Sequence, residues 1–150
     1  MGGQGPLHPE QGHGVIGYYA ALRESGYLTD EDIDGFEQSD SFLMGHPVYT
    51  PEHGIEFTNG SLGIGLGLGI GTAIAGARRN RDYRTYVLVG DGELDEGSVW
   101  EGIMAAPVYK LDHLCLVVDR NGLQLGGDTE EIMPHGGPGQ PDTFIRIEHL

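Results

Sequence analysis

The stretch that decides the fold reads GDGELDEGSVWEGIMAAPVYKLDHLCLVVDRNG and spans residues 90–122. An apolar run, TYVLV at 85–89, comes just before it, and a second run, HLCLVV at 113–118, lies near its end. The residues between the two runs are compatible with a helix. Continuous apolar runs are typical of parallel strands that are buried on both faces of a sheet. The stretch therefore predicts a strand–helix–strand unit in an α/β fold with a parallel sheet.

Polar side chains follow both predicted strands. Asp91 lies between Gly90 and Gly92 after the first run, and Asn121 follows the second run. Open parallel sheets bind ligands beyond the carboxyl ends of their strands. A carboxylate, an amide oxygen and a loop carbonyl suit magnesium, which usually shares its coordination shell with phosphate and water. The alternative is structural: Asp91 caps the next helix, and Asn121 adopts a left-handed turn before Gly122. At this point both interpretations are open.

A glycine-rich segment, TNGSLGIGLGLGIGTAIAGARR at 58–79, precedes this unit. We predict a helix here, capped by Asn59 or Ser61. Each glycine costs a helix about 1 kcal/mol relative to alanine, so another backbone must approach this helix closely. No register of the segment fits the dinucleotide-binding pattern G-x-G-x-x-G, and the chain contains no phosphate-binding G-x-x-x-x-G-K-[ST] motif. At helical spacing, one side carries Gly63, Gly67 and Gly71, and another carries Leu62, Leu66, Ile70 and Ile74.

The remaining segments give weaker signals. Thr29 is a good N-cap, with Asp32 at the position where a capping box would have glutamate. Gly26 is a suitable helix stop. The expected elements are coil over 1–14, a helix over 15–25, a helix from Asp30 to about Gln38, a loop over 41–54, a helix from Glu96 or Ser98 to about Tyr109, and a short strand over 143–147.

Length and composition restrict the class of protein. The 150 residues suffice for one domain with a core, and 27 glycines account for a hydrophobic fraction of only 38%. The net charge of −15 repels nucleic acid and anionic membranes, so we exclude both as partners. The acidic excess fits either ordinary solvated faces or a surface adapted to high salt.

Three further features bear on location and chemistry. The longest apolar stretch, 62–77, is too short and too glycine-rich for a transmembrane helix. No secretory signal opens the chain, so we expect a cytoplasmic protein. Cys115 is the single cysteine and is predicted to be a core residue, so no intrachain disulfide can form.

Taken in order, these motifs resemble the transketolase family of thiamine-diphosphate enzymes. The signature is G-D-G followed after about thirty residues by N. The resemblance covers about residues 11–133 and is greatest to the N-terminal half of a transketolase supplied as a separate chain. It implies a single thiamine-diphosphate-binding domain over 1–150, truncated at both ends relative to the family, with 1–10 and 134–150 as poorly matched tails. The supporting stretches are QGHGVIGYYAALRESGYLTDEDIDGF at 11–36, GHP at 45–47, TNGSLGIGLGLGIG at 58–71, GDGELDEGSVWEGIMAAPVYKLDHL at 90–114 and DRNGLQLGG at 119–127.

The resemblance implies a cofactor site made of oxygen ligands and glycine turns. Asp91, Asn121 and the carbonyl of Leu123 are expected to ligate Mg²⁺ or Ca²⁺. Gly90 and Gly92 are expected to let the turn approach the diphosphate. Backbone N–H groups for the cofactor or substrate are expected from the loop made of Gly60, Ser61, Leu62 and Gly63.

The resemblance also implies catalytic and interface residues. His13 and His46 match family histidines that hydrogen-bond the sugar at the reacting carbon and move protons. Glu96 and Glu101 match carboxylates that face the partner subunit in a proton-linked network. Trp100 is interpreted as a packing residue.

The implied activity is transfer of a two-carbon ketol unit from a ketose phosphate to an aldose phosphate, a transferase reaction of the pentose phosphate pathway. In the family, a second domain across a subunit interface supplies a carboxylate and an aromatic platform for the cofactor. No stretch of this sequence resembles that domain, so we expect inactivity alone and a C-terminal transketolase partner in a homo- or hetero-oligomer. The alternatives are a non-catalytic remnant that binds thiamine diphosphate or only associates with a partner, and a related enzyme acting on another ketose or a keto acid.

Overall fold

The computed structural model describes residues 7–9, 14–133 and 145–147. The chain divides into two compact units, one formed by the chain up to His8 together with Leu62 onward, and the other by Pro9–Ser61. The assignment of 1–150 to a single binding domain stays a prediction.

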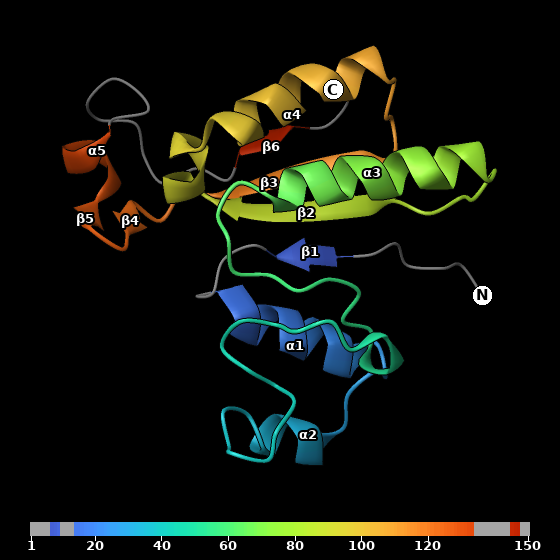
Figure 1. Ribbon diagram of the computed structural model, residues 1–150, viewed down its shortest axis with the longest axis vertical. Coiled ribbons are helices and arrows are strands. Elements are labelled where there is room, and N and C mark those ends of the chain that lie inside the picture. Colours follow the sequence, from blue (N-terminus) through green and yellow to red (C-terminus); the bar gives the residue numbers. More distant parts are fainter. Residues whose placement is uncertain (1–6, 10–13, 134–144, 148–150) are drawn as a thin grey trace. The chain divides into compact units, whose positions relative to one another are not determined.

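The first unit is built on a sheet with the strand order β1-β2-β3-β6 (Figure 1). Its central pair, β2 (Thr85–Gly90) and β3 (Leu114–Asp119), is parallel, which confirms the predicted strand–helix–strand unit. The edge strand β6 (Ile145–Ile147) runs antiparallel to β3, so the sheet is mixed, and residues 143–144 of its predicted span lie outside the described part. The strand β1 (Leu7–Pro9) falls in a stretch predicted as coil.

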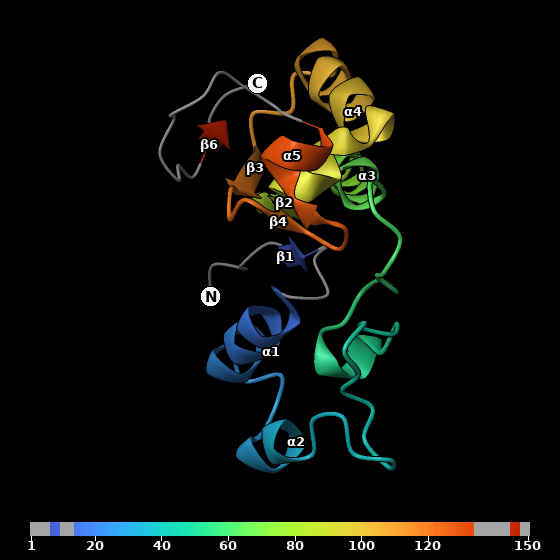
Figure 2. The same cartoon turned by 90° about the vertical axis from the view of Figure 1, so that its left-hand side faces the viewer.

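Two helices, α3 (Gly65–Arg78) and α4 (Gly97–Val108), lie on the same side of this sheet in both views (Figures 1 and 2). Burial alternates along both central strands, so that one face forms the core and the other does not. Within this unit the predicted burial is complete on one face only: on the other face Leu88 and Val117 are partly buried and Tyr86 is exposed. Cys115, predicted in the core, is half-buried on the other face. The core-facing strand residues are Thr85, Val87, Val89, Leu114, Leu116 and Val118.

Helix α3 starts later than predicted. Its N-cap is Ile64, which makes no side-chain capping bond, so the predicted caps at Asn59 and Ser61 are wrong. The reason is backbone geometry: Gly60 and Gly63 have φ values of 141° and 81°, which interrupt the helical path before residue 65. Leu62 consequently lies outside the apolar stripe and is 50% exposed. Leu66 and Ile70 are buried, and Ile74 is partly buried, as predicted.

Of the three glycines predicted on the close-approach side, Gly63 has close neighbours but precedes α3, and along α3 itself the close approaches are at other glycines. A Cβ added to Gly67 or Gly71 would meet nothing within 4 Å, whereas one on Gly69 would lie 2.3 Å from Cγ2 of Val87. At Gly76 it would lie 2.8 Å from the Tyr83 ring. The helix therefore packs directly on β2 side chains, and no second backbone is needed to explain its glycines.

The other elements of this unit are short. A 3₁₀ helix, η3 (Asp91–Asp95), lies between β2 and α4 and was not predicted. Beyond β3, β4 (Leu123–Gln124) pairs antiparallel with β5 (Gly127–Asp128), and α5 (Thr129–Ile132) follows. These elements place the polar groups at the carboxyl ends of β2 and β3.

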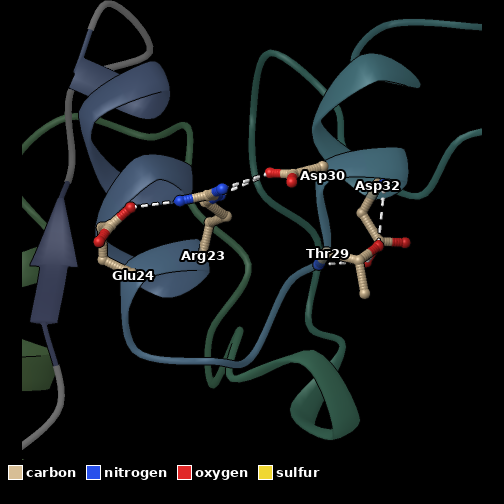
Figure 3. A network of polar contacts seen from close by, with 5 residues as sticks. All are labelled: Arg23, Glu24, Thr29, Asp30 and Asp32. Carbon is tan, nitrogen blue, oxygen red and sulfur yellow. Dashed lines mark hydrogen bonds and ion pairs between the residues drawn. The ribbon is translucent and has the colours of Figure 1, made fainter.

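The second unit contains α1 (Val15–Glu24), α2 (Asp30–Asp34) and η2 (Pro51–His53). The predicted capping box is confirmed, since the Thr29 side chain accepts from the Asp32 amide while the Asp32 carboxylate accepts from the Thr29 amide (Figure 3). Hydrogen bonds from Thr29 lower the pKa of Asp32. Helix α2 is shorter than predicted, because the chain turns at Gly35 and adopts a positive φ at Glu37.

An ion-pair network joins α1 to α2 within this unit. The Arg23 guanidinium contacts the carboxylates of both Glu24 and Asp30 (Figure 3). These side chains are exposed, and exposed ion pairs contribute at most about 1 kcal/mol, so the network adds little to stability. Throughout the described part of the chain, no helix has both the length and the apolar character needed to cross a membrane.

The packing of α3 on β2 gives a testable contrast between two glycines of one helix. We expect Gly69→Ala to lower the free energy of unfolding by about 1–3 kcal/mol, because the new methyl group overlaps Val87 in a stiff, close-packed core. Gly67→Ala is the matched control and should raise it by up to about 1 kcal/mol through helix propensity alone. Urea unfolding of both variants measures the difference, and equal effects would contradict this packing.

Candidate functional site

The register of the sheet brings the two predicted ligand residues to neighbouring turns. Gly90 at the end of β2 pairs with Asp119 at the end of β3. Asp91 follows Gly90 directly as the first residue of η3, and Asn121 lies two residues beyond Asp119. Parallel strands end at the same edge of a sheet, so the predicted juxtaposition follows from the observed register.

The Asp91 carboxylate holds these turns together. It is 1% exposed, and its Oδ1 accepts a hydrogen bond from the Gly92 amide at 3.0 Å. Its Oδ2 accepts from the Gly122 amide at 2.9 Å and from the Thr129 hydroxyl at 3.1 Å. The structural alternative of a simple helix cap is therefore insufficient, because Asp91 bonds to residues 31 and 38 positions away in the chain.

Thr129 is a residue of this site that the sequence does not indicate. It is 1% exposed at the start of α5, and its amide donates to the Gly122 carbonyl at 3.0 Å. The local signal is only an N-cap at Asp128, whose carboxylate accepts from the Glu130 amide at 2.8 Å. Thr129 thus bonds to both Asp91 and Gly122 and closes a ring of hydrogen bonds.

Asn121 is exposed and bonds within its own turn. Its Oδ1 accepts from the Leu123 amide at 2.9 Å, and its Nδ2 donates to Asp119 Oδ2 at 3.2 Å. The left-handed residue is Gly122, with φ of 73°, so the left-handed alternative for Asn121 is wrong. The turn instead folds Leu123 back toward the Asn121 amide oxygen.

The chemistry of these groups fits a hard divalent cation. An ionised carboxylate offers about four lone-pair sites, and Asp91 uses three of them within the chain. Among the described residues, no lysine or arginine forms an ion pair with Asp91, although buried carboxylates usually have a cationic partner or a metal. No group of three His, Cys, Asp or Glu in the described chain could hold a metal, so the candidate site depends on amide and carbonyl oxygens besides this carboxylate.

The GDG turn has a second buried carboxylate, Glu93, which is 2% exposed. Its Oε1 accepts from the Gly63 amide at 3.0 Å, while Oε2 has no hydrogen-bond partner in the described structure. Burial raises the pKa of Glu93 to about 7; the amides of Gly63 and Gly90 act in the opposite direction, and the Glu96 carboxylate raises it slightly further. Sequence reasoning missed Glu93, because its partner lies 30 residues earlier in the chain.

Gly92 has a structural reason to lack a side chain. A Cβ at this position would lie 2.7 Å from the Cβ of Gln124 on β4. The turn is therefore covered closely by the β4–β5 hairpin, and Gly90 beside it is buried. The expected contact of these glycines with a diphosphate stays a prediction.

The predicted catalytic histidines belong to the Pro9–Ser61 unit or fall outside the description. His46 is exposed, and a Cβ added to Gly60 of the same unit would lie 3.6 Å from its ring. His13 lies outside the described residues. Of the predicted cofactor loop, Gly60, Ser61 and Leu62 are exposed, whereas Gly63 is buried in the sheet-containing unit.

The predicted interface residues lie on an exposed face of α4 and at its N-cap. Glu96 and Glu101 are both exposed. Trp100, interpreted from the sequence as a packing residue, is 51% exposed and donates its indole N–H to the Leu94 carbonyl at 2.7 Å. The same helix exposes Met104 and Val108 by 65% and 76%. This concentration of apolar surface beside two carboxylates is unusual for a solvated helix.

The fold is that of an α/β domain, with a buried carboxylate and a cluster of polar groups beyond the ends of two parallel strands. Residues 9–136 match the family model described as transketolase, thiamine diphosphate binding domain. The chain belongs to this family, which confirms the resemblance found in the sequence.

The matched relatives include both separate subunits and complete enzymes. The chain is 46% identical over 123 residues to an apulose-4-phosphate transketolase subunit of Actinobacillus succinogenes, covering 82% of this chain and 45% of that protein. It is 42% identical over 115 residues to human transketolase, covering 75% of this chain and 18% of the enzyme. Transketolase from Campylobacter jejuni superimposes with a TM-score of 0.76 at 33% identity, covering 85% of this chain and 21% of that one. The chain thus spans less than half the length of these relatives.

The hydrogen-bond ring predicts a stabilising role for the Thr129 hydroxyl. We expect Thr129→Val to lower the free energy of unfolding by about 1.5–3 kcal/mol, because it removes a buried hydrogen bond to a carboxylate while keeping the side-chain shape. Thr129→Ser retains the hydroxyl and serves as the control in urea unfolding. A valine variant as stable as the wild type would show that this hydroxyl does not stabilise the Asp91 turn.

Proposed function

We propose that this chain is the N-terminal, thiamine-diphosphate-binding subunit or fragment of a transketolase-type enzyme that transfers ketol units between sugar phosphates. Its family is the thiamine diphosphate binding domain of transketolase. The observation that carries the proposal is the buried Asp91 carboxylate, which has no basic partner in the described chain and is bonded to the Asn121–Leu123 turn through Gly122. Carboxylate, amide and carbonyl oxygens of this kind are the ligands that magnesium prefers, which supports the proposal.

In this proposal, the chain's own residues bind and orient the cofactor. Asp91, Asn121 and the Leu123 carbonyl would hold Mg²⁺ or Ca²⁺, which would offset part of the negative charge of a diphosphate. Thr129 and the amides of Gly92 and Gly122 fix the Asp91 carboxylate so that its remaining lone pair serves the ion.

The reacting end of the cofactor requires other groups of the chain. Thiamine diphosphate, when bound, supplies a carbon nucleophile and an electron sink for breaking the bond beside a ketose carbonyl. His46 and His13 are assigned to the sugar hydroxyls, where imidazole can accept or donate a proton near neutral pH. The exposure of His46 in the described chain is consistent with contact to a substrate.

A partner chain completes the enzyme in this proposal. The relative in Actinobacillus succinogenes is named as one subunit of a transketolase. The match to human transketolase covers only 18% of that enzyme. Glu96 and Glu101 lie at the start and on the exposed face of α4, beside the exposed Trp100 and Met104. We assign this α4 face to a complementary C-terminal transketolase chain, which would bury the apolar side chains and pair with the carboxylates.

Binding of the cofactor is tested by thermal unfolding with magnesium and thiamine diphosphate. At a ligand concentration one hundred times the dissociation constant, binding stabilises the native state by about 2.7 kcal/mol, so the midpoint should rise. Asn121→Ala should weaken binding at least about tenfold. Its side chain is exposed, so the unliganded stability should change little.

Two further variants make this test specific. Asp91→Asn should lose the metal-dependent part of the shift, because the carboxylate charge is removed while the side-chain size is kept. Leu125→Ala is the control: this residue is fully exposed in the β4–β5 hairpin, and the variant should keep the wild-type shift. If magnesium and thiamine diphosphate do not shift the wild type, or shift all variants equally, the anchoring proposal fails.

The need for a partner predicts a concentration-dependent activity. We expect no ketol transfer from the chain alone, and transfer when a complementary C-terminal transketolase chain is added. Met104→Asp should raise the partner concentration for half-maximal activity at least about tenfold, because a buried unpaired carboxylate opposes docking. Leu125→Asp places the same charge outside α4 and should leave this concentration unchanged. Cofactor binding without activity in any mixture would favour the non-catalytic alternative.

A further inference from the structure

We propose that Glu93 and Ser98 are positioning residues: together they fix the peptide groups of Gly63, and so hold the Leu62–Gly63 end of the predicted cofactor loop in its binding conformation. This inference rests on the proposed function, because it concerns a loop expected to face thiamine diphosphate. We call the set of Glu93, Gly63 and Ser98 the Gly63 clamp.

The clamp holds both polar groups of one residue. The Gly63 amide donates to Glu93 Oε1 at 3.0 Å, and the Gly63 carbonyl accepts from Ser98 Oγ at 2.8 Å. Glu93 lies in η3, and Ser98 lies in the first turn of α4. Because hydrogen bonds at both ends of a residue restrict rotation about φ and ψ, the direction in which the chain enters α3 is fixed by the segment that follows Asp91.

The clamp requires the absence of a side chain at its centre. Gly63 has φ of 81°, which side chains disfavour. A Cβ there would also lie 2.4 Å from Ser98 Oγ and 2.8 Å from the Glu96 Cβ. The backbone of the loop therefore touches the start of α4 directly, and a displacement of either element would be transmitted to the other.

The burial of the Glu93 carboxylate is hard to explain by stability alone. It is 2% exposed, and its Oε2 has no hydrogen-bond partner in the described structure. A buried carboxylate oxygen without a hydrogen-bond partner is unfavourable, and an apolar side chain of similar size avoids that cost. Residues that cost stability in this way are typical of functional sites, where geometry is retained at the expense of the fold. The structure therefore indicates that Glu93 serves to place Gly63.

The clamp also gives the residues of the predicted cofactor loop different roles. The Gly63 amide is already bonded to Glu93. The amide available to a ligand next to the clamp would then be that of Leu62, which is exposed. Gly63 is the buried anchor from which that loop departs.

The test measures the clamp and the ligand separately in the same chain. Glu93→Met keeps the length of the side chain but removes the acceptor, whereas Glu93→Gln keeps an acceptor oxygen. Amide hydrogen exchange of Gly63, followed by NMR, reports the clamp without any ligand. Titration with magnesium thiamine diphosphate reports binding, and urea unfolding reports stability.

We expect a separation of binding from stability in Glu93→Met. The Gly63 amide should exchange at least about tenfold faster, and the dissociation constant for magnesium thiamine diphosphate should rise at least about tenfold. The urea midpoint should change little, because the lost hydrogen bond to the Gly63 amide opposes the gain from removing a buried carboxylate. Glu93→Gln should restore both protection and affinity, which a purely structural effect of the charge would not do.

Substitution of Glu93 could also disturb Asp91, which lies two residues away. Ser98 allows the clamp to be tested at a position farther from Asp91. Ser98→Ala acts on the same glycine from α4 and should also speed exchange and weaken binding, while Ser98→Thr keeps the hydroxyl. The double variant Glu93→Met with Ser98→Ala should bind magnesium thiamine diphosphate with the same affinity as the single variant that binds it less tightly, because both substitutions act through Gly63. If the wild type binds the cofactor and the Met and Ala variants bind equally well, the clamp inference is wrong and the proposed function stands. If the wild type does not bind it, the proposed function fails, and the positioning role fails with it.

Discussion

The rest of the site depends on one buried carboxylate. Asp91 accepts hydrogen bonds from the turn that follows β3 and from the first residue of α5, so a single side chain joins three segments that are distant in sequence. Burying a carboxylate without a basic partner is unfavourable, and amide and hydroxyl donors offset only part of that cost. A divalent cation at the same carboxylate would reduce the cost further. Ligand binding and local order at this edge of the sheet are therefore expected to be coupled.

Two buried acidic residues lie in the segment that follows β2, Asp91 and Glu93, and they accept hydrogen bonds from different parts of the chain. Asp91 bonds forward in the sequence to Gly122 and Thr129, whereas Glu93 bonds backward to Gly63. The turn is thus a junction between the glycine-rich segment before it and the asparagine turn after it. In the proposed function these two segments face the same cofactor, and the shared turn gives them a common reference point.

Much of this organisation is readable from the sequence, and most of the exceptions arise from contacts between residues that are distant in the chain. The central strands β2 and β3, α1 and the Thr29 capping box follow from local patterns, and they were predicted correctly. The start of α3 was not, because Gly63 is held out of the helix by Glu93 and Ser98, which lie 30 and 35 residues away. Thr129 was missed for the same reason, since its partner Asp91 is 38 residues distant. Spacing also could not show which glycines touch β2, because that depends on the rotation of α3 about its axis.

The exposed face of α4 is the surface that the proposed partner chain would cover. The buried side of this helix contributes Val99 and Ala106 to the core, while Trp100, Met104 and Val108 are left largely in water. A helix with apolar residues on both sides is typically covered on both sides. Helix α4 begins at Gly97, two residues after the end of η3, which starts at Asp91, so a chain docked on α4 would contact the helix that follows this turn. Association at α4 would then restrain the same turn that the cofactor is proposed to bind, so partner and cofactor are expected to favour each other's binding.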